Sequence, residues 1–256
     1  MRAPPGLALV SSWSIKRYIQ RGMYGEVSVL TISELARFLR VVPRRIPAKV
    51  ESLLRTVSGK PPYGFPPDDF DERTGLETAS HVKIYKLDSV NGNYVHAQGY
   101  VPVPAEIVTQ ALQAIRADVK NHTFVDLGCG KGRALFVAST FGIRRIVGVD
   151  ISPSLVRATL DNVARWKSGS DIQVVCADAS EWEWPRENLV VFLYNPFDGV
   201  ILSKVLENLR RSLCAKPRDA WIIYCSASHG RCFESQKWIE ETGRVGPCIL
   251  YHAAVS

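Results

Sequence analysis

The sequence predicts a three-layer α/β/α fold whose sheet is mostly parallel, with an antiparallel strand near the C-terminus. The main observation is an alternation from residue 105 onward between short apolar runs of strand length and longer stretches with apolar residues every three or four positions. Such alternation is typical of a parallel sheet with helices on both faces. A second observation, the strand, glycine turn and helix of residues 123–141, indicates where the ligand site of this fold lies.

Residues 123–132 combine a buried strand with an unusual turn. Phe124, Val125 and Leu127 form an apolar run of the kind that is covered on both sides in a parallel sheet. Glycines then occupy positions 128, 130 and 132, so the chain can turn tightly and another molecule can approach its backbone. A helix is expected over residues 132–141.

The remaining elements follow the same alternation. We expect further strands at 145–149, 172–176, 189–194 and 220–225, and helices at 105–117, 153–166 and 199–214. The C-terminal residues 236–241 and 248–254 fit either a hairpin across Thr242-Gly243 or a short helix and one strand, and we expect the hairpin. A smaller hairpin or flap is expected over residues 81–97, because Asn91-Gly92 is a strong turn signal.

Composition excludes several classes of protein. No apolar run approaches the roughly 20 residues of a membrane helix, so we expect no membrane span. The six cysteines contain no C-x-x-C pair, which favours a reduced, cytoplasmic protein over a disulfide framework or a zinc site. The histidines are also scattered along the chain. We therefore predict no metal.

Charge is unevenly distributed, and it divides the chain. Residues 1–60 hold eleven Lys or Arg against three Glu, whereas residues 61–80 hold one Arg against five acids. We interpret residues 1–75 as a basic helical N-terminal extension with a Pro/Gly-rich linker, and residues 76–256 as the main domain. The charge of the basic arm is compatible with binding to nucleic acid, an acidic protein or a membrane surface. It is also compatible with a solvated helix that only packs on the domain.

The glycine turn resembles one known family. Asp126 to Gly132 reads Asp-Leu-Gly-Cys-Gly-Lys-Gly, which fits neither the dinucleotide fingerprint G-x-G-x-x-G nor the phosphate loop G-x-x-x-x-G-K-[ST]. It resembles the first motif, [DE]-x-G-x-G-x-G, of class I methyltransferases, which have a Rossmann-like seven-strand sheet and use S-adenosylmethionine. The resemblance covers residues 105–225, because later landmarks of the family arrive in order.

The resemblance implies where the cofactor binds. Asp150, at the end of the second strand, matches the acid that binds both ribose hydroxyls, and Asp178, after the third strand, matches the acid at the adenine. Asp126 and the glycine loop would face the methionine part. The implied cofactor residues are Asp126, Gly128, Cys129, Gly130, Gly132, Asp150, Ile151, Asp178, Ala179 and Asn195.

Two further segments bear on the methyl acceptor. Asn195-Pro196-Phe197 resembles the motif [DNS]-P-P-[FYW] of members that methylate nitrogen, although this chain has only one proline. In those enzymes the Asn oxygen and a backbone carbonyl accept hydrogen bonds from the amine, and the aromatic ring stacks on it. Tyr100, in the segment Gly99-Tyr100-Val101-Pro102, resembles the entry segment of non-SET protein-lysine methyltransferases. The implied catalytic residues are therefore Asn195, Pro196, Phe197 and Tyr100.

The sequence thus predicts an S-adenosylmethionine-dependent methyltransferase, with a nitrogen such as a protein lysine as acceptor. The alternatives are a small-molecule N- or O-methyltransferase and a non-catalytic S-adenosylmethionine-binding protein. A nucleic-acid acceptor stays open without a recognition domain to support it. The expected partner is a protein or small-molecule methyl acceptor.

Overall fold

The computed structural model describes residues 68–83, 87–89 and 96–253, all within the unit Phe65–Ser256. The predicted helical extension therefore lies almost wholly outside the described residues. So does the turn of the hairpin predicted over residues 81–97. The boundary between residues 75 and 76 stays a prediction.

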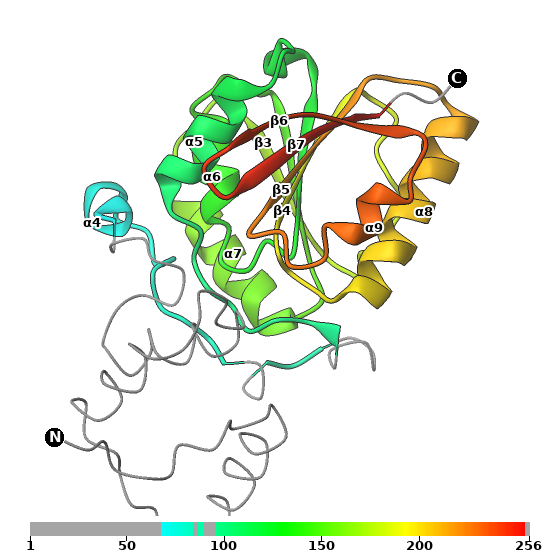
Figure 1. Ribbon diagram of the computed structural model, residues 1–256. Helices are drawn as coiled ribbons and strands as arrows, with labels where there is room; N and C mark the ends of the chain where they lie inside the picture. Colours follow the sequence, from blue (N-terminus) through cyan, green and yellow to red (C-terminus); the bar gives the residue numbers. More distant parts are fainter. Residues whose placement is uncertain (1–67, 84–86, 90–95, 254–256) are drawn as a thin grey trace, which may run out of the picture. The chain divides into compact units, whose positions relative to one another are not determined.

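A seven-stranded sheet forms the centre of this unit, in the order β3-β2-β1-β4-β5-β7-β6 (Figure 1). All strands are parallel except β7, which runs antiparallel to both of its neighbours, so the predicted fold class is confirmed. The strands are β1 (Thr123–Leu127), β2 (Arg145–Asp150), β3 (Asp171–Cys176), β4 (Leu189–Tyr194), β5 (Ala220–Cys225), β6 (Ile239–Val245) and β7 (Cys248–Ala253).

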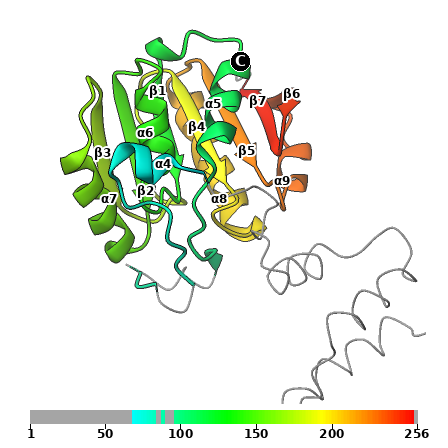
Figure 2. The ribbon, with the colours of Figure 1, turned by 90° about the vertical axis from the view of Figure 1, so that its left-hand side faces the viewer.

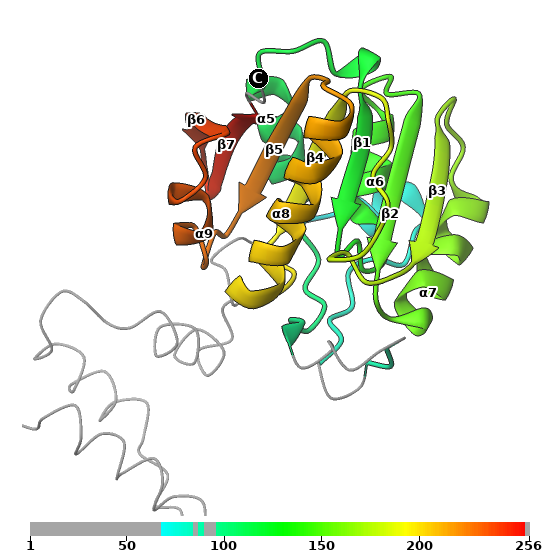
Figure 3. The same ribbon diagram turned by 90° about the vertical axis from the view of Figure 1, so that its right-hand side faces the viewer.

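Helices cover both faces of this sheet, as the alternation predicts. One face carries α5 (Ala105–Ala114), α6 (Arg133–Ser139) and α7 (Pro153–Arg165), which Figure 2 shows in front of the strands. The other face carries α8 (Gly199–Ala215) and the short α9 (Arg231–Glu234), with α8 in front of β4 and β5 in Figure 3. A 3-10 turn, η3 (Val119–Asn121), leads from α5 into β1. No helix of the described part is long and apolar enough to cross a membrane.

Side-chain caps begin the two helices that follow strands β2 and β4. Ser152 accepts a hydrogen bond from the amide of Leu155 at the start of α7, and Pro153 occupies the first turn, where its missing N–H costs nothing. Asp198 caps α8 in the same way, because its side chain accepts from the amides of Val200 and Ile201. Both caps lie at the C-terminal edge of the sheet, where they fix the loops of the candidate site.

The C-terminal hairpin forms, but its predicted turn is wrong. β6 and β7 are joined at Gly246-Pro247, where Gly246 has a φ of 53°. Thr242-Gly243 instead interrupts the pairing of β6 with β7, at a shift in register between Glu241 and Gly243. A Thr-Gly pair serves a bulge as readily as a turn, so its presence alone did not locate the reversal.

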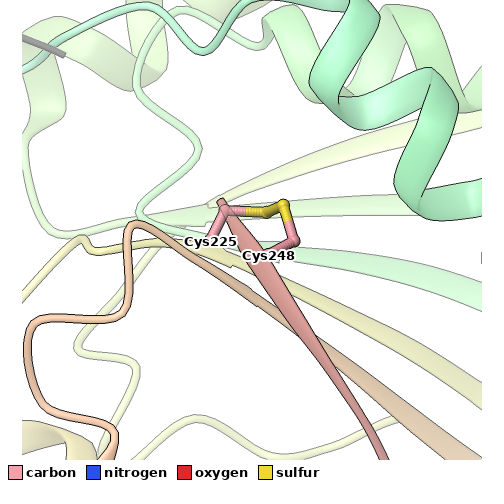
Figure 4. Close-up of a disulfide and its surroundings, with 2 residues drawn as sticks. All are labelled: Cys225 and Cys248. Carbon is pink, nitrogen blue, oxygen red and sulfur yellow. A yellow bond between two sulfur atoms is a disulfide. The ribbon is translucent and has the colours of Figure 1, made fainter. Parts of the chain in front are cut away.

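Cys225 and Cys248 form a disulfide, against the expectation that all cysteines are reduced (Figure 4). These residues are direct partners in the antiparallel pairing of β5 with β7, so the sheet brings them together although 23 residues separate them in sequence. Cys129, Cys176, Cys214 and Cys232 remain free. A spacing analysis finds short C-x-x-C motifs and cannot find a pair that depends on strand register. The cytoplasmic location stays a prediction.

Ion pairs connect the segment around the short helix α4 (Phe70–Thr74) to the sheet domain. The guanidinium of Arg133, at the start of α6, lies 2.8 Å from Asp68 and 3.1 Å from Asp71, and its side chain is only 5% exposed. Thr78 also accepts a hydrogen bond from Arg133 Nε at 2.7 Å. The acidic segment after residue 67, expected as linker, therefore provides the counter-charge for a buried arginine beside the glycine turn.

Candidate functional site

The candidate site lies at the C-terminal edge of the parallel strands, where the loops after β1, β2 and β4 meet. β1 lies between β2 and β4, so residues that end these three strands are neighbours. This edge of an open parallel sheet is where ligands bind. The predicted residues arrive there from separate parts of the chain.

All three glycines of the turn adopt a left-handed backbone, with φ of 74° at Gly128, 57° at Gly130 and 87° at Gly132. Residues with a Cβ rarely adopt this conformation. A Cβ at Gly132 would also lie 2.7 Å from Thr159 of α7. The glycines are therefore required both by the turn itself and by the close packing around it.

Asp150 is the last residue of β2, and its carboxylate reaches the glycine turn. Oδ2 accepts a hydrogen bond from the amide of Gly130 at 2.8 Å, and Oδ1 accepts one from the amide of Ser152 at 2.9 Å. Burial raises the pKa of Asp150 to about 6, against the lowering effect of these amides. Each oxygen keeps a lone pair, so the carboxylate can still accept hydrogen bonds from a diol.

Asp126 is the unsatisfied group of the site. It is 4% exposed, and within the described part of the chain its carboxylate makes no hydrogen bond. Burial, and next the charge of Asp150, raises the pKa of Asp126 well above its usual value. A buried carboxylate without a donor is costly, so this position is suited to a ligand that brings a cationic or N–H group.

The other predicted cofactor residues differ in burial and in the contacts that they make. Asp178 is buried after β3, and its Oδ1 accepts hydrogen bonds from the amide and hydroxyl of Ser180 at 2.9 and 2.7 Å. Ala179 is buried beside it, and Ile151 is partly exposed after Asp150. Cys129 is buried, with its sulfur 2.9 Å from where a Cβ on Gly148 would lie, so its side chain packs between strand and helix.

Tyr100 lies over the glycine turn. A Cβ added to Gly130 would overlap its ring, and its hydroxyl donates to the carbonyl of Thr78 at 2.8 Å. The backbone of Tyr100 pairs with Val82 in an isolated antiparallel bridge. The predicted entry segment thus covers the turn, and burial raises the pKa of its phenol, which stays a neutral donor.

The segment after β4 reaches the same turn. Asn195 has a φ of 48°, and its Oδ1 accepts a hydrogen bond from the hydroxyl of Tyr224 at 3.1 Å. The side chain of Pro196 lies against Gly128, where it would overlap an added Cβ. The carbonyl of Pro196 accepts a hydrogen bond from the amide of Gln98 at 2.9 Å. Phe197 is 8% exposed within the core next to α8, so its ring is largely covered by protein.

These observations fit the cofactor that the motif implies. The turn offers backbone free of Cβ atoms, Asp126 offers an unsatisfied acceptor, and Asp150 offers two oxygens at the end of β2. A sulfonium-bearing amino acid with a ribose would use such groups, because its ammonium and its diol both donate hydrogen bonds.

Sequence reasoning missed several residues that hold the site together. Thr159 donates to the carbonyl of Gly130 at 2.6 Å, and Tyr224 joins Asn195 to the amide of His229, which donates to its hydroxyl at 3.2 Å. Neither residue belongs to a motif. Arg133 was detectable in principle, since it is a lone charge on an otherwise apolar helix.

Residues 124–216 match the family described as "Methyltransferase domain". This match agrees with the strand order and with the acids Asp126 in β1, Asp150 at the end of β2 and Asp178 after β3. Over residues 124–216 the chain is therefore similar to a methyltransferase domain, and the sheet around these residues has a Rossmann-like arrangement.

Two curated relatives match parts of the chain. A ribosomal protein L11 methyltransferase from Tolumonas auensis is 42% identical over 48 residues, which is 19% of this chain and 16% of that protein. A protein-lysine N-methyltransferase from Saccharolobus islandicus is 32% identical over 74 residues, which is 28% of this chain and 45% of that protein. The chain thus spans less than half the length of each.

Among solved structures, an RNA methyltransferase from Salinibacter ruber in complex with S-adenosyl-L-homocysteine is similar with a TM-score of 0.39 and 23% identity, covering 60% of this chain and 92% of that one. A ribosomal protein L11 methylase from Lactobacillus delbrueckii subsp. bulgaricus gives a TM-score of 0.43 and 16% identity, covering 59% and 76%.

Proposed function

We propose that the protein transfers a methyl group from S-adenosylmethionine to a nitrogen acceptor, such as the side chain of a protein lysine. The proposal depends mainly on one contact: Pro196, from the loop after β4, lies directly against Gly128 of the glycine turn. The side chain implied for the acceptor is therefore next to the loop implied for the cofactor.

The groups around Asn195 support a nitrogen as acceptor. Its amide side chain is oriented by Tyr224, whose hydroxyl donates to Oδ1 at 3.1 Å. A carbonyl oxygen of an amide is a neutral acceptor, and it can direct an N–H without holding the amine in its charged form as a carboxylate would. Asn195 has a left-handed backbone, with a φ of 48°, directly after the last residue of β4.

The reaction requires orientation more than strong acid or base catalysis. The sulfonium supplies an activated methyl group when the cofactor is bound, and the protein must align the nucleophile and exclude water. Tyr100 and Pro196 contribute by covering the glycine turn from two sides. A lysine acceptor, with a free pKa of about 10.4, must also lose a proton before it reacts.

Transfer of a radiolabelled methyl group in a lysate of the source cells tests the proposal. Purified protein and labelled S-adenosylmethionine are added, and the label is sorted into protein, RNA, DNA and small molecules. Label in the protein fraction that acid hydrolysis recovers as methyl-lysine is the expected result. Label in RNA, DNA or a small molecule would contradict the lysine acceptor, and no label above a heat-treated control would contradict the activity.

A further inference from the structure

His96 and Asp198 form a pair on the edge of the proposed acceptor loop. His96 Nδ1 lies 2.8 Å from Asp198 Oδ2, and the two side chains are 31% and 33% exposed. We propose that His96, oriented by Asp198, accepts the proton that an ammonium acceptor loses before methyl transfer. This inference rests on the proposed function.

Backbone pairing fixes where this histidine lies. Ala97 forms an antiparallel bridge with Phe197, the amide of Gln98 donates to the carbonyl of Pro196, and the amide of Asp198 donates to the carbonyl of His96 at 2.9 Å. The chain around His96 is therefore held residue by residue against the loop that follows Asn195.

The two oxygens of Asp198 perform different tasks. Oδ1 accepts from the amides of Val200 and Ile201 at 2.9 and 3.3 Å and caps α8, which leaves Oδ2 for His96. Burial raises the pKa of Asp198, but the hydrogen bonds from His96 and from these amides outweigh it and lower that pKa. The carboxylate is thus ionised at neutral pH and can only accept.

An ionised partner decides which nitrogen of His96 carries the proton. Nδ1 must donate to Asp198, so in neutral His96 the lone pair is on Nε2. Within the described part of the chain Nε2 makes no hydrogen bond, and Asp198 is the charged group in contact with the ring. This is the arrangement of an oriented proton acceptor.

The ammonium N–H bond breaks, its electron pair stays on the amine nitrogen, and the proton forms a bond with the Nε2 lone pair, giving an imidazolium beside Asp198. The amine lone pair then forms the N–C bond as the S–C bond breaks, and that electron pair remains on sulfur. Removal of the ammonium from water lowers its pKa, which favours loss of its proton, and the exposed side of His96 lets that proton leave to solvent.

The dependence of kcat on pH between 6 and 10.5 tests the inference, with the labelled protein fraction of the lysate as acceptor. His96→Asn keeps an N–H near the position of Nδ1 but has no basic nitrogen. We expect kcat to fall about 100-fold at pH 7, and to recover toward the wild-type value near pH 10, where solvent deprotonates the amine. Asp198→Asn, which still caps α8, should lower kcat about tenfold with the same recovery.

Controls separate this inference from the proposed function. His252→Gln, which alters a histidine on β7 outside the site and keeps a donor for Asp219, should leave kcat unchanged. Calorimetry should give both site variants the cofactor affinity of the wild type, which verifies the fold. Absence of wild-type labelling would refute the proposed function. Wild-type labelling with His96→Asn either unaffected or slowed equally at every pH would overturn the role of His96 alone.

Discussion

Tyr100 and Gly130 are in such close contact that a Cβ at position 130 would overlap the phenol ring. The ring is held in place from its other end, since the hydroxyl donates to Thr78 at 2.8 Å. This contact connects the segment before α5 with the turn after β1. Gly130 is therefore necessary both for its left-handed backbone and for its closeness to the ring.

Gly130→Ala should destabilise the protein by more than backbone strain alone. A φ of 57° costs a non-glycine residue about 1–2 kcal/mol, and the overlap with Tyr100 adds to it. Gly75→Ala is the matched control, because Gly75 has a φ of 71° but no other atom within 4 Å of the position that a Cβ would take. Urea unfolding measures both. Equal losses, or no recovery in the double variant Gly130→Ala with Tyr100→Ala, would contradict the overlap.

Asp126→Asn should stabilise the cofactor-free protein at neutral pH while weakening cofactor binding. A folded-state pKa raised above the unfolded value contributes stability that is present at low pH and is lost as pH rises through the folded pKa. Asp150, with a pKa of about 6, loses its contribution between roughly pH 4 and 6. Asp126→Asn has no carboxylate at position 126, so it keeps the stability that the wild type loses when Asp126 ionises.

Thermal unfolding from pH 4 to 8 provides the measurement. We expect the Tm of Asp126→Asn to exceed that of the wild type by a few degrees, roughly 2–4 °C for each kcal/mol, with the difference growing as pH rises. Asp161→Asn, a change at an exposed carboxylate of α7, should show neither effect. A variant that is less stable than the wild type at pH 7 would disprove the assignment of Asp126 as a buried, unsatisfied charge.

Arg133→Ala should cost about 3–5 kcal/mol, because it leaves Asp68 and Asp71 without their counter-charge in a largely buried site. Arg73→Ala removes an arginine whose pair with Asp69 is about 60% exposed on both sides, and it should cost at most about 1 kcal/mol. Denaturant titrations compare the two variants. Similar losses would show that the buried cluster does not fasten α4 to the domain.

Asn195→Gly should lower kcat by 100-fold or more with little change in cofactor affinity, since a lost hydrogen bond to the reacting group costs about 10²–10³ in kcat. Glycine tolerates the φ of 48°, so this variant removes the side chain without straining the turn. Tyr224→Phe, which removes the donor to Asn195 Oδ1 and also the acceptor of the His229 amide, should cost about tenfold. Turnover of Asn195→Gly near the wild-type rate would exclude this side chain from contact with the acceptor.

Local patterns predicted most of the fold. Each strand from β1 to β5 was expected within about one residue of its observed bounds. For β1, β2, β4 and β5 the reason is that a buried parallel strand is a nearly continuous apolar run, whereas β3 is a partly exposed edge strand. The acids at 126, 150 and 178 were located from the same strands, since each lies within two residues of the C-terminal end of its strand. α5 ends at Ala114, three residues earlier than expected, where the chain turns extended at Ile115.

What the sequence did not predict depends on contacts between distant residues. Arg133 meets Asp68 across 65 residues, and Cys225 meets Cys248 through strand pairing, and neither contact leaves a periodic signal. The contact of Tyr100 with Gly130 and that of Pro196 with Gly128 are of this kind as well. Motifs therefore identified the candidate residues. Which of them lie in contact with one another is known only from the folded structure.

Titration calorimetry with S-adenosylmethionine tests the central claim most directly. The wild type should bind the cofactor, and Asp150→Ala should bind it at least about 100-fold more weakly, because the carboxylate that accepts from the glycine turn, and that we assign to the ribose, is lost. Asp171→Ala, at the exposed start of β3, should bind like the wild type. Undetectable binding by the wild type, or equal affinity in Asp150→Ala, would contradict the assigned cofactor site.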